Sequence, residues 1–77
     1  MLHVTKAQYD HDFTIRVSFD DGTEGLVNLE SQLQGPVFEP LQRVENFKNF
    51  TVDPELGTIV WMNGVDLAPE FLKDCLV

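Results

Sequence analysis

Residues 51–77 read TVDPELGTIVWMNGVDLAPEFLKDCLV, and this stretch decides the fold that the sequence predicts. Asp53–Gly57 predicts a turn, because proline fixes φ and glycine accepts a left-handed conformation. The apolar run Thr58–Met62 then predicts a central strand covered on both faces, either within the chain or by a second copy of it. Asn63–Gly64 predicts a tight turn after that strand. Pro69 is well placed as the first residue of a helix.

The helix that begins at Pro69 has an apolar stripe that predicts how it packs. The stripe consists of Phe71, Leu72, Cys75 and Leu76. Such a stripe is typical of a helix that buries one face against a sheet. Cys75 is expected to pack there as a small apolar side chain, since free cysteine is among the most buried residue types.

The first third of the chain predicts a three-stranded antiparallel meander. Phe13–Phe19 alternates apolar and polar residues, which indicates a strand with one face in water. Asp20–Gly22 is a strong hairpin signal, and Thr23–Leu29 is the expected return strand. His3–Tyr9 is the expected first strand, and Asp10–Asp12 is the turn that follows it.

A short helical segment is predicted between the meander and residues 51–77. Gly35–Pro36 interrupts regular structure, and the apolar residues of the next stretch recur at a spacing of three. They are Phe38, Leu41, Val44 and Phe47. A strand is expected to resume at Phe50–Val52. The sequence thus predicts one α+β domain over residues 1–77, with a mostly antiparallel sheet of about five strands and the C-terminal helix packed on it.

The charge of the chain narrows the classes of partner. Thirteen acidic residues and five basic ones give a formal net charge of −8. This charge disfavours direct contact with nucleic acid or with anionic membranes. It suits a basic partner protein, because complementary charge steers association. No apolar run approaches the roughly 18 residues that a membrane-spanning helix requires.

The cysteine content and the N-terminus predict a cytoplasmic protein. A single cysteine excludes a disulfide within the chain and fits a reducing compartment. Met1–Lys6 lacks the basic region and apolar core of a secretory signal.

Few residues offer chemistry, so the sequence predicts no enzyme, no catalytic residue, no cofactor and no metal site. The turn Asp10–Asp12 contains His11 and two carboxylates, which are competent metal ligands. A solvated turn is the preferred interpretation, since aspartate favours turns through its own backbone hydrogen bonds.

Ile59, Trp61 and Met62 are the candidate interface. Tryptophan and methionine are enriched at interfaces. Trp61 is nevertheless expected in the core, because a small domain needs its few large apolar residues inside. The leading hypothesis is a protein-interaction module whose partner is itself, as a homodimer, or a small basic protein. The alternative is a small-molecule or metal-binding regulator that uses Trp61 and the acidic turns.

The order of motifs resembles the domain-of-unknown-function 2442 family of small prokaryotic proteins. The resemblance rests on Asp21–Gly22, Asn28–Leu29, Pro36–Leu41 and above all on Gly57–Glu70, which reads GTIVWMNGVDLAPE. It implies a small α+β domain and brings no established activity and no catalytic residues. Some members resemble fusions to helix-turn-helix domains and others neighbours of small toxin-like proteins, which implies an antitoxin-like role. A role in transcription would then run through a partner, because no DNA-binding domain is expected in this chain.

Overall fold

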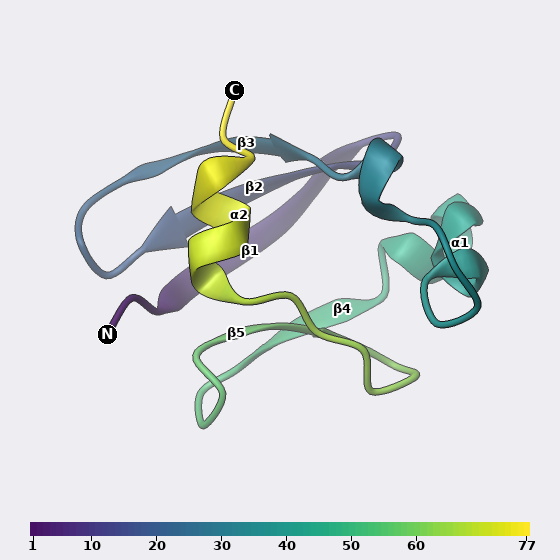
Figure 1. The fold of residues 1–77 in the computed structure, drawn as a ribbon. Helices are drawn as coiled ribbons and strands as arrows, with labels where there is room; N and C mark the ends of the chain where they lie inside the picture. Colours follow the sequence, from purple (N-terminus) through teal and green to yellow (C-terminus); the bar gives the residue numbers. More distant parts are fainter.

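A three-stranded antiparallel sheet and a separate two-stranded hairpin form the frame of the molecule (Figure 1). The computed structural model describes all residues from Met1 to Val77. Its elements, in chain order, are β1 (Val4–His11), β2 (Thr14–Phe19), β3 (Glu24–Asn28), the 3₁₀ helices η1 (Glu30–Gln32) and η2 (Glu39–Gln42), α1 (Val44–Phe47), β4 (Phe50–Asp53), β5 (Thr58–Trp61) and α2 (Pro69–Asp74). The structure confirms an α+β fold with five strands.

The three-stranded sheet is the predicted meander, in the order β1–β2–β3. Ile15 is the centre of its register, opposite Tyr9 on β1 and Val27 on β3. Ile15 and Val17 are fully buried, whereas Arg16 between them is exposed. The alternation therefore places one face of the sheet in the core and the other in water.

The prediction of one five-stranded sheet was wrong, because β4 and β5 form a sheet of their own. Aromatic rings fill the space between β1 and the hairpin. The ring of Phe47 lies 6.3 Å from that of Tyr9 on β1 and 5.9 Å from that of Trp61 on β5. The two sheets therefore meet through side chains and not through a continuous ladder. A backbone hydrogen bond from Val4 N to Gly57 O, at 2.8 Å, joins β1 to the β4–β5 turn.

The strand β5 was predicted to be a central strand covered on both faces, but it belongs to a two-stranded sheet, with Ile59 buried and Val60 partly exposed. Chain segments do lie along both of its edges. It pairs with β4 along one edge. Along the other edge it meets residues 65–67, through a bridge between Val60 and Asp66 and a hydrogen bond from Trp61 N to Val65 O at 2.9 Å. Chain segments of this protein therefore cover both edges of β5.

The predicted helical segment is divided into two short helices, η2 and α1. Arg43 separates them with an extended backbone (φ −93°, ψ 122°). Leu41 and Phe47 are buried as expected, but Val44 is 36% exposed. A strict spacing of three matches the three residues per turn of a 3₁₀ helix better than the 3.6 of an α-helix, and such helices stay short.

The helix α2 lies across the three-stranded sheet, as Figure 1 shows. Pro69 is its first residue, and Leu72 is fully buried. Cys75 follows the helix and is half-buried, and burial raises the pKa of its thiol. After α2, Leu76 forms a bridge with Val27 of β3.

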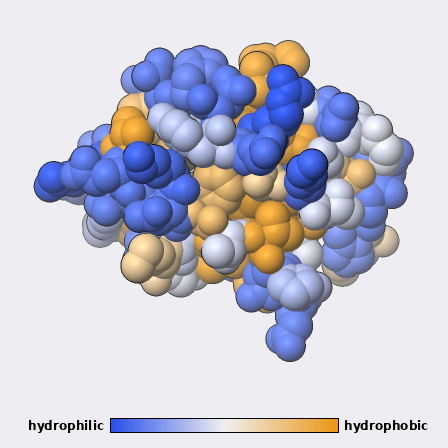
Figure 2. Space-filling model, turned by 180° about the vertical axis from the view of Figure 1, so that it is seen from behind, coloured by the Kyte–Doolittle hydropathy of each residue, from blue (hydrophilic) through white to orange (hydrophobic).

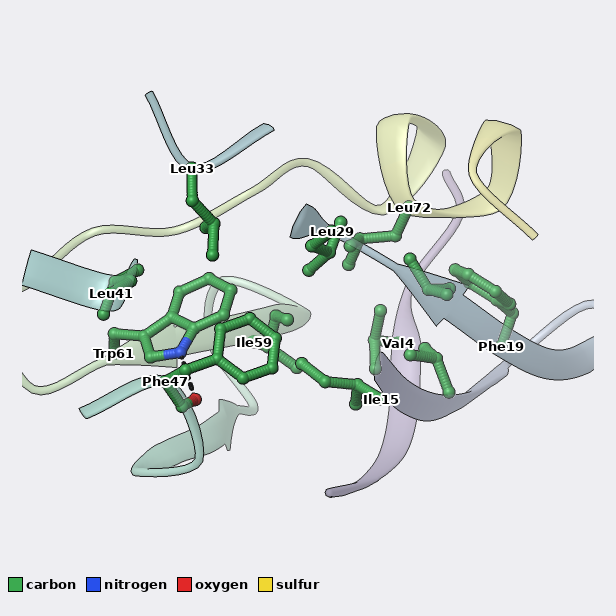
Figure 3. Packing of buried hydrophobic residues seen from close by; sticks show 12 residues of the cluster. Val4, Ile15, Phe19, Leu29, Leu33, Leu41, Phe47, Ile59, Trp61 and Leu72 are labelled. Atoms are coloured by element: carbon green, nitrogen blue, oxygen red, sulfur yellow. Dashed lines mark hydrogen bonds between the residues drawn. The ribbon is translucent and has the colours of Figure 1, made fainter. Parts of the chain in front are cut away.

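Twelve buried apolar side chains form one core between the two sheets and α2. Figure 3 shows Leu33, Leu41 and Phe47 around the indole of Trp61, and Leu72 beside Leu29. The indole Nε1–H donates a buried hydrogen bond to the backbone carbonyl of Phe47, with an N···O distance of 2.7 Å. This bond connects the end of β5 to the end of α1. The core position predicted for Trp61 is confirmed.

The side opposite the view of Figure 1 has apolar surface at its centre. Figure 2 shows these atoms in a hollow surrounded by hydrophilic side chains. No helix in the structure is both long enough and apolar enough to cross a membrane.

Gly57 closes the β4–β5 turn beneath the side chain of His3. Its φ is +67°, a backbone conformation that residues other than glycine rarely adopt. A Cβ atom at this position would lie 2.3 Å from Cδ2 of His3. Gly64, in the next turn, has a φ of +83° and open space around the same position. A side chain at Gly64 would therefore meet backbone strain alone, whereas a side chain at Gly57 would also overlap His3.

Trp61→Phe should lower the free energy of unfolding by at least about 1–3 kcal/mol, because the buried carbonyl of Phe47 loses its donor. Urea denaturation followed by far-UV circular dichroism measures this loss without the tryptophan signal. Tyr9→Phe is the matched control, since the Tyr9 hydroxyl has no hydrogen-bond partner in the chain, and it should be nearly neutral. Equal midpoints for both variants would contradict the role given to the indole.

Gly57→Ala should be more destabilising than Gly64→Ala, for which left-handed strain alone predicts about 1–2 kcal/mol. The excess is due to the imidazole of His3, so it should shrink in the His3→Ala background. A double-mutant cycle in urea measures this coupling. A cycle with no coupling would show that the ring does not restrict residue 57.

Candidate interaction surface

Each of three hollows on the surface is lined by at least one residue of η2. One adjoins Pro40 and Gln42, a second shares Gln42, and the third shares Pro40. Pro40 and Gln42 both belong to η2 (Glu39–Gln42). This helix has a proline in its first turn and ends at Arg43, whose backbone is extended. This short helix is therefore the element around which the surface is indented.

The third hollow is the most apolar of the three and is here termed the Met62 groove. Its lining residues are Pro40, Leu41, Asn46, Met62 and Asn63, and its volume is about 240 Å³. Leu41 is 3% exposed and belongs to the core, whereas Met62 is 87% exposed. The groove therefore has an apolar base and a long, exposed apolar side chain at its rim.

Side-chain amides join the segments that make up the groove. Asn46 Nδ2 donates to the carbonyl of Pro40 at 3.0 Å. Asn63 Nδ2 donates to the carbonyl of Val37 at 3.5 Å, and its Oδ1 accepts from Val65 N at 3.3 Å. The Asn63 bond connects residues that are 26 positions apart in the chain. The groove is thus formed within the folded chain before any partner arrives.

The predicted interface residues are separated by the fold. Ile59 is fully buried and Trp61 is 2% exposed, because alternate residues of β5 share its inward face. Both side chains are enclosed by the chain itself, and Trp61 lines none of the three hollows. Met62 comes one residue after β5 and points into solvent. It is the member of the predicted set that a partner can contact.

The rest of the groove was not predicted. Pro40, Leu41 and Asn46 were assigned to a helical segment, and Asn63 to a turn. Their assembly depends on contacts between η2 and the turn after β5, which no local pattern records. The sequence identified Met62, a large apolar residue directly before a turn, but not its neighbours in the groove.

The charges around the hollows are mostly negative. Arg43 donates to Glu45 at 2.7 Å, so each neutralises the other. Glu39 lines the hollow beside Pro40, and Glu30 lines the one beside Gln42. Neither carboxylate has a cationic partner within the chain. The uncompensated charges at this surface are therefore acidic.

The Asp10–Asp12 turn, the candidate metal site in the sequence, brings one imidazole and one carboxylate together. His11 Nδ1 lies 2.5 Å from Oδ2 of Asp10. Asp12 adopts a positive φ of 43° in the same turn. No group of three or more histidine, cysteine, aspartate or glutamate side chains in the structure is arranged to hold a metal ion.

Two aspartates of the β2–β3 turn have lowered pKa values. The backbone N–H and the imidazole of His3 bond to Asp20 and hold the pKa of that carboxyl below its usual range. The ammonium of Lys73, with the hydroxyl and N–H of Thr23, does the same for the pKa of Asp21. These contacts attach the N-terminus and α2 to one turn.

The family match includes the groove. The family model described as "Protein of unknown function (DUF2442)" matches residues 4–74 of the chain. The chain belongs to the DUF2442 family. The resemblance inferred from the sequence motifs is thereby confirmed, and the DUF2442 match contains every residue that lines the Met62 groove. No significant match was found among curated proteins or among solved structures.

The lowered pKa values predict a loss of stability in acid. Below about pH 4 the unfolded chain binds protons that folded Asp20 and Asp21 resist, so stability falls as the pH decreases from about 5. Urea midpoints measured between pH 7 and pH 2.5 should decline. Asp21→Asn should flatten this decline, whereas Glu55→Gln, at an exposed carboxylate without a cationic partner, should leave it unchanged. Parallel declines in Asp21→Asn and the unaltered chain would exclude a contribution from Asp21.

Proposed function

We propose that this chain is a protein-interaction module that binds a basic partner protein. Four of its 13 acidic side chains take part in ion pairs, which leaves nine without a cationic partner. These nine are Asp12, Glu24, Glu30, Glu39, Asp53, Glu55, Asp66, Glu70 and Asp74. All but one of them are exposed. This excess of free carboxylates is the observation that carries the proposal.

The same charge distribution ranks the classes of partner. A carboxylate-rich surface repels phosphate groups and anionic lipids, and it attracts cationic proteins over a Debye length of about 8–10 Å. It also opposes a homodimer, because each copy carries a net charge of −8. A basic protein is therefore favoured over nucleic acid, a membrane or a second copy. A neutralising, antitoxin-like role toward a small basic protein is the specific form that the family resemblance suggests.

The test is reconstitution with the product of the gene adjacent to that of this chain in its native host. The two proteins, mixed at micromolar concentration, should co-elute in size-exclusion chromatography. Because the attraction is electrostatic, calorimetry should show weaker binding as salt rises from 50 to 300 mM. A tagged chain recovered from the host provides the independent arm, and its principal partner should carry net positive charge. An acidic principal partner, or binding that salt does not weaken, would contradict the proposal.

A further inference from the structure

We infer that the Met62 groove is the docking site for a partner segment that carries one apolar anchor side chain next to cationic residues. This inference rests on the proposed function and specifies the site and the partner's chemistry. The anchor enters between η2 and the turn after β5. Its cationic neighbours meet Glu39 of η2 in the adjoining hollow and Glu30 of η1 in the hollow beyond it.

The size of the groove favours a single side chain as its occupant. Sites for small molecules usually measure about 300–1,000 Å³ and enclose most of the ligand. The Met62 groove measures about 240 Å³ and is lined by five residues. One leucine- or phenylalanine-sized group fits that space, while the rest of the partner remains outside. A few anchors of this kind dominate the affinity of many interfaces.

The apolar surface of the groove consists of one rigid and one adaptable part. Leu41 and Pro40 are fixed by the core and by the Asn46 hydrogen bond. Met62 is exposed, and the unbranched methionine side chain adjusts to the shape of whatever it contacts. Because hydrogen bonds from Asn46 to Pro40 and from Val65 to Asn63 already order each wall, docking requires little further ordering of the backbone.

The charges argue for cationic flanks on the partner segment. Pro40 lines both the Met62 groove and the neighbouring hollow that contains Glu39, so these two hollows adjoin. Gln42 connects the Glu39 hollow to the one that contains Glu30. Arg43 also lines the Glu39 hollow, where Glu45 offsets its charge at a distance of 2.7 Å. A segment crossing η2 would therefore meet an apolar site first and two free carboxylates beside it.

Titration of the ¹⁵N-labelled chain with synthetic peptides tests this inference. Three peptides are compared: one leucine flanked by lysines, the same peptide with serine in place of leucine, and leucine flanked by glutamates. The lysine–leucine peptide should shift the amide signals of Leu41, Met62 and Asn63. The other two should bind at least about tenfold more weakly, because each lacks the anchor or the cationic flanks.

Variants of the chain make the assignment specific. Met62→Ala should weaken binding of the lysine–leucine peptide about tenfold without changing the urea midpoint, since the side chain is exposed. Leu56→Ala is the matched control, at an exposed apolar residue of the β4–β5 turn, and should leave binding unchanged. Glu39→Gln should reduce the salt dependence of binding.

The outcomes separate this inference from the proposed function. Binding of lysine peptides with shifts that map away from the groove, or that Met62→Ala does not weaken, overturns the docking site and leaves the proposed function standing. Failure of every lysine peptide to bind at millimolar concentration counts against both. Shifts of Met62 that depend on the concentration of the chain alone would assign the groove to a second copy and overturn the inference.

Discussion

The hydrogen bond from the Trp61 indole to the Phe47 carbonyl is the interaction on which the rest of the structure depends. It is buried, and it joins the end of β5 to the end of α1 across 14 residues. An unpaired carbonyl in an apolar interior is strongly disfavoured, so the bond fixes how the two segments meet. The ring of Phe47 also packs against those of Tyr9 and Phe13, so the same segment contacts the three-stranded sheet. One polar contact thus joins the hairpin to α1, and α1 directly follows η2 in the chain.

The elements that local chemistry specifies were predictable from the sequence. Asp20–Gly22 and Asn63–Gly64 supply turn residues, the Phe13–Phe19 alternation supplies a strand, and Pro69 supplies a helix start; each is found in the structure. The division of the five strands into two sheets was not predictable. The rings of Tyr9, Phe47 and Trp61, which pack the two sheets together, come from three segments. Patterns within one segment carry no record of which other segment will cover it.

The candidate site shows the same limit at the scale of single residues. The apolar character of Ile59, Trp61 and Met62 was evident, and two of them became core because strand geometry turns Ile59 and Trp61 to the same side. Met62 differs in its surroundings, since the strand has ended before it. Its partners in the groove are Pro40 and Leu41, about 20 positions earlier in the chain. Surface sites built in this way become visible only when the chain has folded.

The segments along β3 and β5 have a consequence for how this chain meets other proteins. Val77 N donates to Leu26 O at 3.0 Å on β3, and Asp66 bridges Val60 on β5. Open strand edges are templates for strand addition, the route to amyloid-like stacking and to β-augmented complexes. Here a newcomer would first have to displace the chain's own main-chain contacts at these two edges. At these two edges recognition therefore falls to side chains, where sequence changes in a partner can be discriminated.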